Sequence, residues 1–502
     1  MSAQTEYNEL LAKLAEVNDL HKAAALLSWD QQTYMPPKGA KARGEQLATL
    51  SALAHRLFTK SQVGDTLQRL AEASAELSPD ENKTVELTQW HYDRATRLPE
   101  AFVKECSETE AQAFEAWTVA KKNADFKTFQ PHLEKLISQA RRRADYYGYE
   151  GSPYNALLES FERGMTAEKI QPLFAEMAAR LSDLTARILA SPNQPKTDWL
   201  DDTEWAVDRQ WDFSILILRE MGYDFDAGRQ DKSAHPFTTN FDLHDVRVTT
   251  RLHPKMLFSG FRSSVHEGGH ALYEQGFLDA DRRTPLAEAI SLGIHESQSR
   301  MWENMIGCSR AFWTNYFPRL REHFPQELND VTLDELVRAV NKVDRTLIRV
   351  EADEVTYGIH IVIRFEIELA LLEGELEAAD IPAAWNAKIK EYLGLDVPDD
   401  GVGCLQDVHW SYGAFGYFPT YALGNLYAAQ MMPRIEKDLP QLWEQVGRGE
   451  LLPLREWLRK NVHEVGSRKT APELIASLTG RGLEAEPFLA YLEKKYGELY
   501  RL

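Results

Sequence analysis

The feature that most constrains the fold is a helical spacing of apolar residues that persists along most of the chain. Near the start, apolar residues stand three or four positions apart, at Tyr7, Leu10, Leu14 and Val17. The same spacing runs from Ile170 to Ile188. It gathers apolar side chains on one face of an α-helix. The sequence therefore predicts a mainly α-helical protein.

A further helix is expected to begin at Thr332, because Thr332 and Glu335 have the spacing of a capping box. Apolar positions continue at helical spacing from there to Val350. This pattern places Arg349 on a helix.

Evidence for strands is confined to one short segment. Val246, Val248 and Thr250 alternate with polar residues, shortly after a turn at residues 234–237. The chain has 502 residues, with no low-complexity linker and no fixed-period repeat, and it is long enough to bury a large core. We expect one large, mostly helical body with a short sheet near its middle.

The chain is strongly acidic, with 57 Lys and Arg residues, 77 Asp and Glu residues and a formal net charge of −20. Such a surface repels phosphate backbones and anionic lipids unless basic residues form a patch, and no patch is evident. The most apolar stretch, 359–372, is interrupted by charges. The N-terminus lacks a signal-peptide pattern, and the three cysteines are far apart. We expect a cytoplasmic protein that binds neither nucleic acid nor membranes.

The segment 263–272 carries the strongest chemical signal. On a helix, His266 and His270 lie one turn apart and point the same way, so their imidazoles can bind one metal ion. Glu267 is offset from them by about 100°, and it can hold a water molecule on the metal without being a ligand. Metal-assisted amide hydrolysis requires this division of roles.

A purely structural interpretation exists, because Ser264 and Glu267 also satisfy a capping box. Gly268 and Gly269 argue against it. Each glycine costs a helix interior about 1 kcal/mol relative to alanine, and the missing side chains leave room for another group to approach the backbone. We therefore favour a metal site.

A catalytic zinc ion usually has three protein ligands and an open fourth position. Candidates for the third ligand are His295 and Glu296, the latter 26 residues after His270. A short loop and a helix reversal can return this segment to the first helix. On the residues alone, both remain chemically possible.

The helix motif and the segment 295–298 together resemble the carboxypeptidase Taq family of zinc metallocarboxypeptidases. Five further motifs agree with the family, in its order: Trp29-Asp30-Gln31 with Met35-Pro36, His235-Pro236-Phe237, Asp245-Val246-Arg247-Val248-Thr249, Ile348-Arg349-Val350-Glu351-Ala352-Asp353 and Gly403-Cys404-Leu405-Gln406-Asp407-Val408-His409-Trp410. These motifs span most of the chain.

The resemblance implies one metallocarboxypeptidase domain over residues 1–502, mainly helical and clefted, with helical subdomains on either side of the cleft. It implies His266, His270 and Glu296 as ligands of one zinc ion per chain, for which cobalt can substitute. Glu267 is then the general acid and base. The family also implies a homodimer that releases C-terminal amino acids from peptides with broad specificity.

One position departs from a neighbouring pattern. Related glutamate-zincins often carry an acidic residue four positions after the ligand Glu, where it orients a histidine. This chain has Arg300 there and Glu303 three positions later. The carboxylate that histidine ligands generally need is therefore unassigned.

An exopeptidase needs a fixed cation for the terminal carboxylate of its substrate. Arg349 lies in a family motif and its planar guanidinium suits this role, although a surface ion pair is the usual role of an arginine. Arg247 is a weaker candidate, because its strand can direct it to solvent. Asp245 and Asp353 are expected to support these arginines.

The segment 409–421 is rich in aromatic residues, most of which core packing explains. A tetrahedral intermediate also needs hydrogen-bond donors opposite the metal. His409 is suitable, together with Tyr417 or Tyr421, between which the sequence does not choose. His235 is equally a substrate contact or a turn residue.

Two other functions fit parts of the pattern. A zinc oligopeptidase that cuts internally in short peptides would share the metal motif. A peptide-binding protein with a structural zinc ion would close all four metal positions, usually with Cys and His, and the cysteines lie far from the motif. A carboxypeptidase is the leading prediction.

Overall fold

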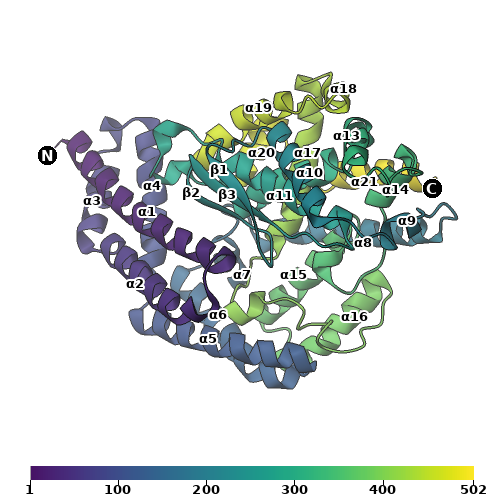
Figure 1. Ribbon diagram of the computed structural model, residues 1–502. Coiled ribbons are helices and arrows are strands. Elements are labelled where there is room, and N and C mark those ends of the chain that lie inside the picture. Colours follow the sequence, from purple (N-terminus) through teal and green to yellow (C-terminus); the bar gives the residue numbers. More distant parts are fainter. Residues whose placement is uncertain (1) are drawn as a thin grey trace.

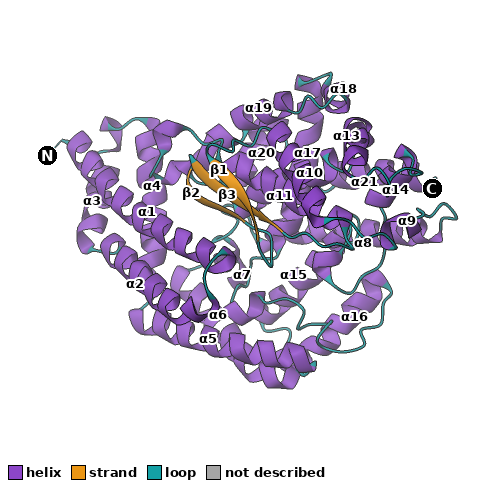
Figure 2. Cartoon of the chain, in the orientation of Figure 1, coloured by secondary structure: helices purple, strands orange, loops and turns teal. Residues whose placement is uncertain are grey.

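The computed structural model describes residues 2–502, and within this range it contains 21 α-helices around one three-stranded sheet (Figures 1 and 2). The helices before the sheet are α1 (Ala3–Thr33), α2 (Ala40–Phe58), α3 (Ser61–Glu72), α4 (Pro79–Arg97), α5 (Glu100–Asn123), α6 (Phe126–Tyr147), α7 (Pro153–Leu158), α8 (Ala167–Ala190), α9 (Asp198–Asp201) and α10 (Val207–Met221). The helices after it are α11 (Leu257–Glu274), α12 (Leu292–Arg300), α13 (Arg310–His323), α14 (Leu333–Val340), α15 (Tyr357–Glu373), α16 (Ile381–Leu393), α17 (Pro419–Asp438), α18 (Leu442–Gly447), α19 (Leu452–Asn461), α20 (Ala471–Thr479) and α21 (Glu486–Tyr500). The predicted fold class, mainly α-helical with a small sheet, is confirmed.

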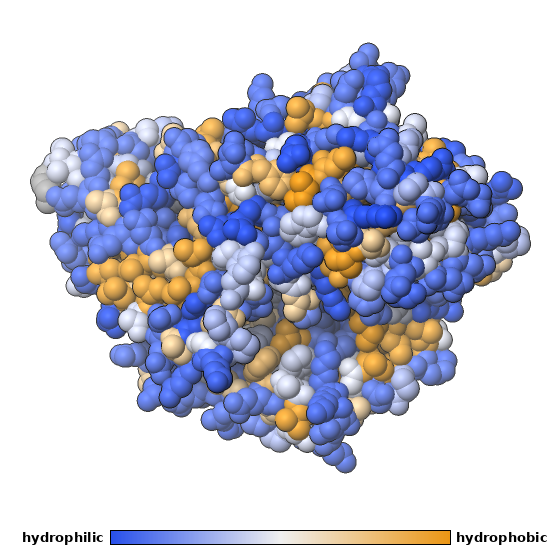
Figure 3. Space-filling model, viewed as in Figure 1, coloured by the Kyte–Doolittle hydropathy of each residue, from blue (hydrophilic) through white to orange (hydrophobic). Residues whose placement is uncertain are grey.

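The apolar helix faces pack into one large core and one small core. The large core draws on residues from Ala113 to Tyr500. The small core lies between α1, α3 and α4, which form the left side of the molecule in Figure 1. The visible face is hollowed near its middle, between the part that carries the sheet and the part that carries α15 and α16 (Figure 3). No helix within residues 2–502 combines the length and apolar character needed to cross a membrane.

The sheet has the order β1-β3-β2. Its strands are β1 (Gly228–Lys232), β2 (Thr238–Asp242) and β3 (Asp245–Thr250). The central strand β3 pairs in parallel with β1 and antiparallel with β2. Val246 and Val248 of β3 are fully buried, as the alternation predicts, and β3 packs against α11 while β2 packs against both α11 and α1. The sheet therefore connects the N-terminal helices to α11.

The helix predicted to run through Val350 is shorter than its apolar spacing suggests. α14 begins at the expected capping box but ends at Val340. The side-chain amide of Asn341 then donates to the carbonyl oxygens of Val337 and Cys308, both at 2.9 Å. These side-chain bonds compete with the next helical turn.

As a result, Arg349 does not lie on an α-helix but in a short 3-10 turn, Arg349–Glu351. Its backbone N–H donates to Gln406 Oε1 at 2.9 Å. Asp353 holds the loop between α14 and Arg349, because its carboxylate accepts a hydrogen bond from the backbone N–H of Asp344 at 3.1 Å. Contacts with distant residues therefore place Arg349, and the local apolar period does not.

Candidate active site

Three predicted metal ligands come together on α11 and α12. His266 and His270 share one face of α11, with ring centroids 4.8 Å apart. Glu296 Oε2 lies 3.6 Å from His266 Nε2 and 3.4 Å from His270 Nε2. The three ligand atoms lie within 4.8 Å of one another. Two imidazole nitrogens and one carboxylate oxygen form a donor set that fits a divalent metal such as zinc.

Glycines allow the helices of this cluster to approach closely. A Cβ atom on Gly269 would lie 2.7 Å from Ser299 Cα and 2.8 Å from the Gln298 carbonyl oxygen. A Cβ atom on Gly424 of α17 would lie 2.5 Å from Glu296 Cγ. A side chain at either position would push α12 away from its neighbours. Gly269 of α11 and Gly424 of α17 thus permit the helix contacts that bring Glu296 to the histidines, whereas Gly268 faces Leu218 and Met221 of α10.

His295, the other candidate for the third ligand, is engaged elsewhere. Its Nε2 atom lies 2.8 Å from Glu274 Oε1. Its ring stacks on His270, with centroids 4.3 Å apart and an interplanar angle of 16°. The geometry therefore favours Glu296 as the ligand, and it places the ring of His295 against one face of the His270 ring.

Glu303 supplies the carboxylate that the sequence left unassigned. Its Oε2 atom lies 2.8 Å from His266 Nδ1, which leaves Nε2 of that ring for a metal. Glu303 lies in η5, a π-helical turn (Met301–Ile306) that directly continues α12. Single π-helical turns are frequent at functional sites.

Arg300 binds both carboxylates of this segment. Its Nε donates to Glu296 Oε1 at 2.7 Å and its Nη1 donates to Glu303 Oε2 at 3.3 Å. Sequence reasoning assigned no role to either Arg300 or Glu303. Their positions four and seven residues after Glu296 were the available signal, because this spacing keeps side chains on one helix face.

Two of the three candidate ligands are already in the form that binds a metal, and the third must lose a proton. Burial lowers the pKa of His266, but Glu296 and Glu303 more than offset this and raise it to about 9. Burial raises the pKa of Glu296, but Arg300 and His266 more than offset this, and the pKa lies well below its usual range. Burial also lowers the pKa of His270 to about 3. An ionised carboxylate and a neutral imidazole are the forms that bind metal ions.

Glu267 lies on α11 between the ligands and is held by β2. Thr238 Oγ1 donates to Glu267 Oε2 at 2.8 Å and lies 3.0 Å from the carbonyl oxygen of the same residue. Burial raises the pKa of Glu267 above its ordinary value. Sequence reasoning missed Thr238, although it directly follows the His235-Pro236-Phe237 motif. His235 itself is exposed in the loop before β2, and its role stays a prediction.

Arg349 is buried, with 6% of its surface exposed. Its Nε and Nη2 donate to Asp407 Oδ1 at 3.0 and 2.7 Å, and its Nη1 donates to Tyr357 Oη at 3.0 Å. A guanidinium has five N–H donors, so two of them have no partner among residues 2–502. The prediction that Asp353 supports this arginine is wrong, because Asp353 hydrogen-bonds within its own loop and Asp407 has that role.

The guanidinium of Arg247 donates two parallel hydrogen bonds to Asp245, from Nε to Oδ1 and from Nη2 to Oδ2, both at 2.8 Å. This pair confirms the expected support by Asp245. The guanidinium also lies over the ring of Trp29, 4.5 Å from its centroid. The N-terminal helix α1 therefore packs its Trp29 against the sheet, and Arg247 stays the weaker candidate for substrate binding.

The aromatic donors lie beside Arg349. His409 Nε2 and Tyr421 Oη are 3.2 Å apart, and the ring of Tyr417 is 5.4 Å from each of the other two rings. Arg349 lies 5.0 Å from the centroid of Tyr421. The structure thus groups His409, both tyrosines and the proposed carboxylate site.

Tyr357 and α17 connect this group to the metal cluster. The guanidinium of Arg300 lies 4.3 Å from the ring centroid of Tyr357, and the hydroxyl of Tyr357 accepts a hydrogen bond from Arg349. Tyr421 stands three residues before Gly424, which contacts Glu296. The two predicted halves of the site are therefore neighbours.

The assignment of the third ligand leads to a first prediction. We expect Glu296→Ala to lose its bound metal on dialysis, because Glu296 Oε2 faces both histidine nitrogens. We expect His295→Ala to keep it, because the imidazole of His295 is directed to Glu274. Metal analysis of both dialysed proteins tests this. Metal loss from the His295 variant alone would reverse the assignment.

A second prediction concerns Glu303. Partners of this kind typically change metal affinity by about 10- to 100-fold when they are removed. We therefore expect Glu303→Gln to weaken metal binding by this order without abolishing it. A competition titration with a chelator measures the affinity, and an unchanged value would show that His266 does not depend on this carboxylate.

Comparisons with known proteins agree with this geometry. The sequence model of the family described as carboxypeptidase Taq (M32) metallopeptidase matches residues 9–496 of the chain. The chain is 42% identical to thermostable carboxypeptidase 1 of Thermus thermophilus and 40% identical to carboxypeptidase 1 of Bacillus subtilis, with all of each chain covered. It also resembles the crystal structure of M32 carboxypeptidase from Deinococcus radiodurans, with 41% identity, a TM-score of 0.97, and 99% of this chain and 100% of that chain covered. The chain therefore belongs to the carboxypeptidase Taq (M32) family and is a metallocarboxypeptidase, a hydrolase of peptide bonds.

Proposed function

We propose that this enzyme uses one zinc ion per chain to release C-terminal amino acids from peptides with broad specificity. The observation that carries this proposal is the position of Arg349, which Tyr357 connects to Arg300 and so to the ligand Glu296. A cation suited to a terminal carboxylate thus lies beside a site suited to zinc.

The protein groups divide the chemistry among them. Zinc bound by His266, His270 and Glu296 would supply a Lewis acid and lower the pKa of water to about 7. Thr238 holds one carboxylate oxygen of Glu267, which leaves the other to accept a proton from the attacking water. Glu267 then delivers this proton to the leaving amine.

Binding and charge stabilisation come from the second half of the site. The two unused N–H groups of Arg349 bind the substrate's terminal carboxylate. His409, with Tyr417 or Tyr421, donates a hydrogen bond to the oxygen that becomes negative when the carbonyl is attacked. Burial lowers the pKa of His409 to about 4, so its ring is neutral near pH 7 and donates from a single nitrogen.

A peptide ladder tests the proposed function. The purified protein is incubated with a peptide of mixed sequence, and the masses of the products are measured by mass spectrometry at successive times. Stepwise loss of residues from the C-terminus is the expected result, with little dependence on the terminal side chain. Internal cuts would instead indicate an oligopeptidase, and an intact peptide would indicate a binding protein.

The proposal includes further properties that the family resemblance implies. These are a single catalytic domain over residues 1–502, cobalt as a substitute for zinc, and a homodimer. A cytoplasmic location is proposed separately, because the three widely spaced cysteines are typical of a reducing compartment. The large core supports one domain from Ala113 to Tyr500, and β2, which packs against both α1 and α11, joins the N-terminal helices to it. Light scattering measures the oligomeric state, and reconstitution of the metal-free protein with cobalt tests the substitution.

A further inference from the structure

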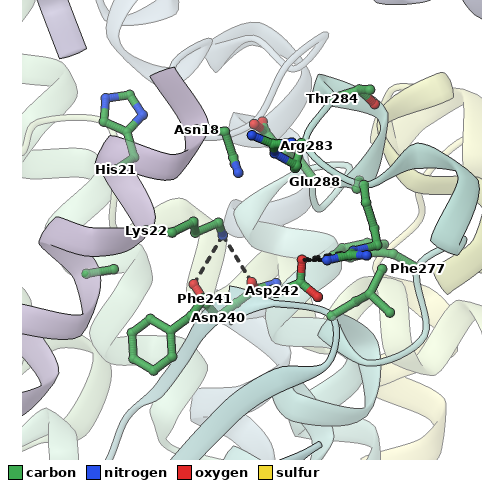
Figure 4. A pocket seen from close by; sticks show the side chains of 14 residues that line it. Asn18, His21, Lys22, Asn240, Phe241, Asp242, Phe277, Arg283, Thr284 and Glu288 are labelled. Carbon is green, nitrogen blue, oxygen red and sulfur yellow. Dashed lines mark hydrogen bonds and ion pairs between the residues drawn. The ribbon is translucent and has the colours of Figure 1, made fainter. Parts of the chain in front are cut away.

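A cavity of about 260 Å³ lies where α1 meets β2 and the segment that follows α11 (Figure 4). We call it the seam pocket. Its lining includes Asn18 and Lys22 of α1, Asn240 of β2, and Phe277, Ala287 and Glu288 of the segment after α11. None of the metal ligands and none of the proposed substrate-binding residues lines it, so it is distinct from the site described above.

Two ionisable side chains in the seam pocket, Lys22 and Glu288, have no charged ion-pair partner among residues 2–502. Lys22 Nζ donates to the carbonyl oxygen and to Oδ1 of Asn240, at 3.1 and 3.0 Å, and no carboxylate of residues 2–502 lies within ion-pair distance of it. Glu288, whose side chain is more than half exposed, has one residue within ion-pair distance in the described part of the chain, His91 at 3.8 Å. Burial lowers the pKa of His91 to about 4, so this imidazole carries no charge near pH 7.

The other charged groups of the pocket already have partners. Arg283 pairs with Asp19, and Arg282 pairs with Asp242 at 2.9 Å. Burial raises the pKa of Glu288 to about 7, and the charge of Lys22 offsets part of this rise. Lys22 and Glu288 are nevertheless too far apart to form an ion pair. A ligand between them would meet an ammonium group without an ion-pair partner on one side and, on the other, a carboxyl group that an incoming cation would ionise fully.

The pocket therefore suits a small zwitterion. Its volume is below the range of about 300–1,000 Å³ that holds drug-sized ligands. A carboxylate can accept from Lys22 and from the amide of Asn18, which reaches into the same space in Figure 4. An ammonium group can donate to Glu288. Ala25, Phe277 and Ala287 add an apolar wall for a side chain, and a free α-amino acid has all three features.

A chain of contacts links the pocket to the metal cluster. The side-chain amide of Asn240, which binds Lys22, also donates to Glu274 Oε2. Glu274 Oε1 binds His295 Nε2 at 2.8 Å, and His295 stacks on the ligand His270. A change in the position of Lys22 would thus be transmitted through hydrogen bonds to a residue that supports the metal ligand.

We propose that the seam pocket binds a free α-amino acid between Lys22 and Glu288, and that its occupancy is coupled to the metal cluster through Asn240, Glu274 and His295. An α-amino acid is the chemical class of product that a carboxypeptidase releases. The interpretation as product sensing therefore rests on the proposed function, whereas binding itself does not.

Calorimetry on the metal-free full-length protein with L-leucine tests the binding. Lys22→Met and Glu288→Gln should each weaken binding by about 10- to 150-fold, the effect of removing one hydrogen bond to a charged group. Lys13→Met, a charge removal on the same helix outside the pocket, should leave it unchanged. Thermal melts confirm that all variants fold.

Several outcomes would overturn the proposal. One is the absence of a binding heat when L-leucine is added to the parent protein. A second is equal binding of N-acetyl-L-leucinamide, which lacks both charges. A third is loss of binding in Arg349→Met but not in Lys22→Met. The last result would place the amino acid at the catalytic site, and preferential binding of a dipeptide would make the pocket an extension of the substrate groove. All these readouts are independent of the peptide ladder.

The coupling is tested in the Arg349→Met background, which removes leucine binding at the catalytic site. Because linkage is reciprocal, coupled sites should give an L-leucine affinity that differs between zinc-loaded and metal-free protein by about fivefold or more. Adding His295→Phe keeps a ring against His270 but removes the bond to Glu274, and the difference should then vanish. Equal affinities of the zinc-loaded and metal-free forms without this substitution would overturn the coupling.

Discussion

Replacing Glu267 by glutamine is expected to lower kcat by about 10²- to 10⁴-fold, the usual contribution of a general acid and base. The metal should remain at one ion per chain, because the ligand cluster consists of His266, His270 and Glu296 and does not include Glu267. Glutamine has nearly the same shape and can still accept from Thr238. The substitution therefore removes the proton carrier and little else.

Metal analysis and turnover of the same preparation check this expectation. Thr238→Val is a milder variant for comparison, because it retains the carboxylate of Glu267 and removes only the hydrogen bond that holds this carboxylate. A smaller loss of kcat is expected there. If the glutamine variant were purified without metal, or kept much of its activity, Glu267 would have another role.

Replacing Arg349 by methionine is expected to lower kcat/KM by about 30- to several-thousand-fold, since losing one partner of a buried charge pair typically costs about 2–5 kcal/mol. Metal content should not change. The structure also explains why the variant should fold: Asp407, which binds Arg349, keeps its 2.7 Å hydrogen bond from Arg364 Nε. No buried carboxylate is left without a cation.

Four rates isolate the proposed ion pair. Both proteins are assayed with a peptide that has a free C-terminal carboxylate and with the same peptide amidated. Amidation should impair the parent enzyme strongly and the Arg349 variant far less, because the variant has already lost the interaction. Arg247→Met serves as the matched control and should retain the full penalty. Equal penalties in the parent and the Arg349 variant would move carboxylate recognition elsewhere, with Arg247 as the next residue to test.

The sequence by itself determined those parts that depend on near neighbours in the chain. The helical period predicted the fold class, and the alternation at Val246 and Val248 predicted β3. The spacing of His266 and His270 put two imidazoles on one face of α11. Helix and strand periods act over a few residues, so they can be read locally.

Only the tertiary structure decided which distant groups meet. Whether His295 or Glu296 faces the histidines depends on the packing of α12 between α11 and α17, which the missing side chains of Gly269 and Gly424 permit. Asp407 replaced the expected Asp353 beside Arg349, because the helix after Thr332 stops early and a loop takes its place. These contacts join residues far apart in sequence and depend on how side chains fill the core, which no local period encodes.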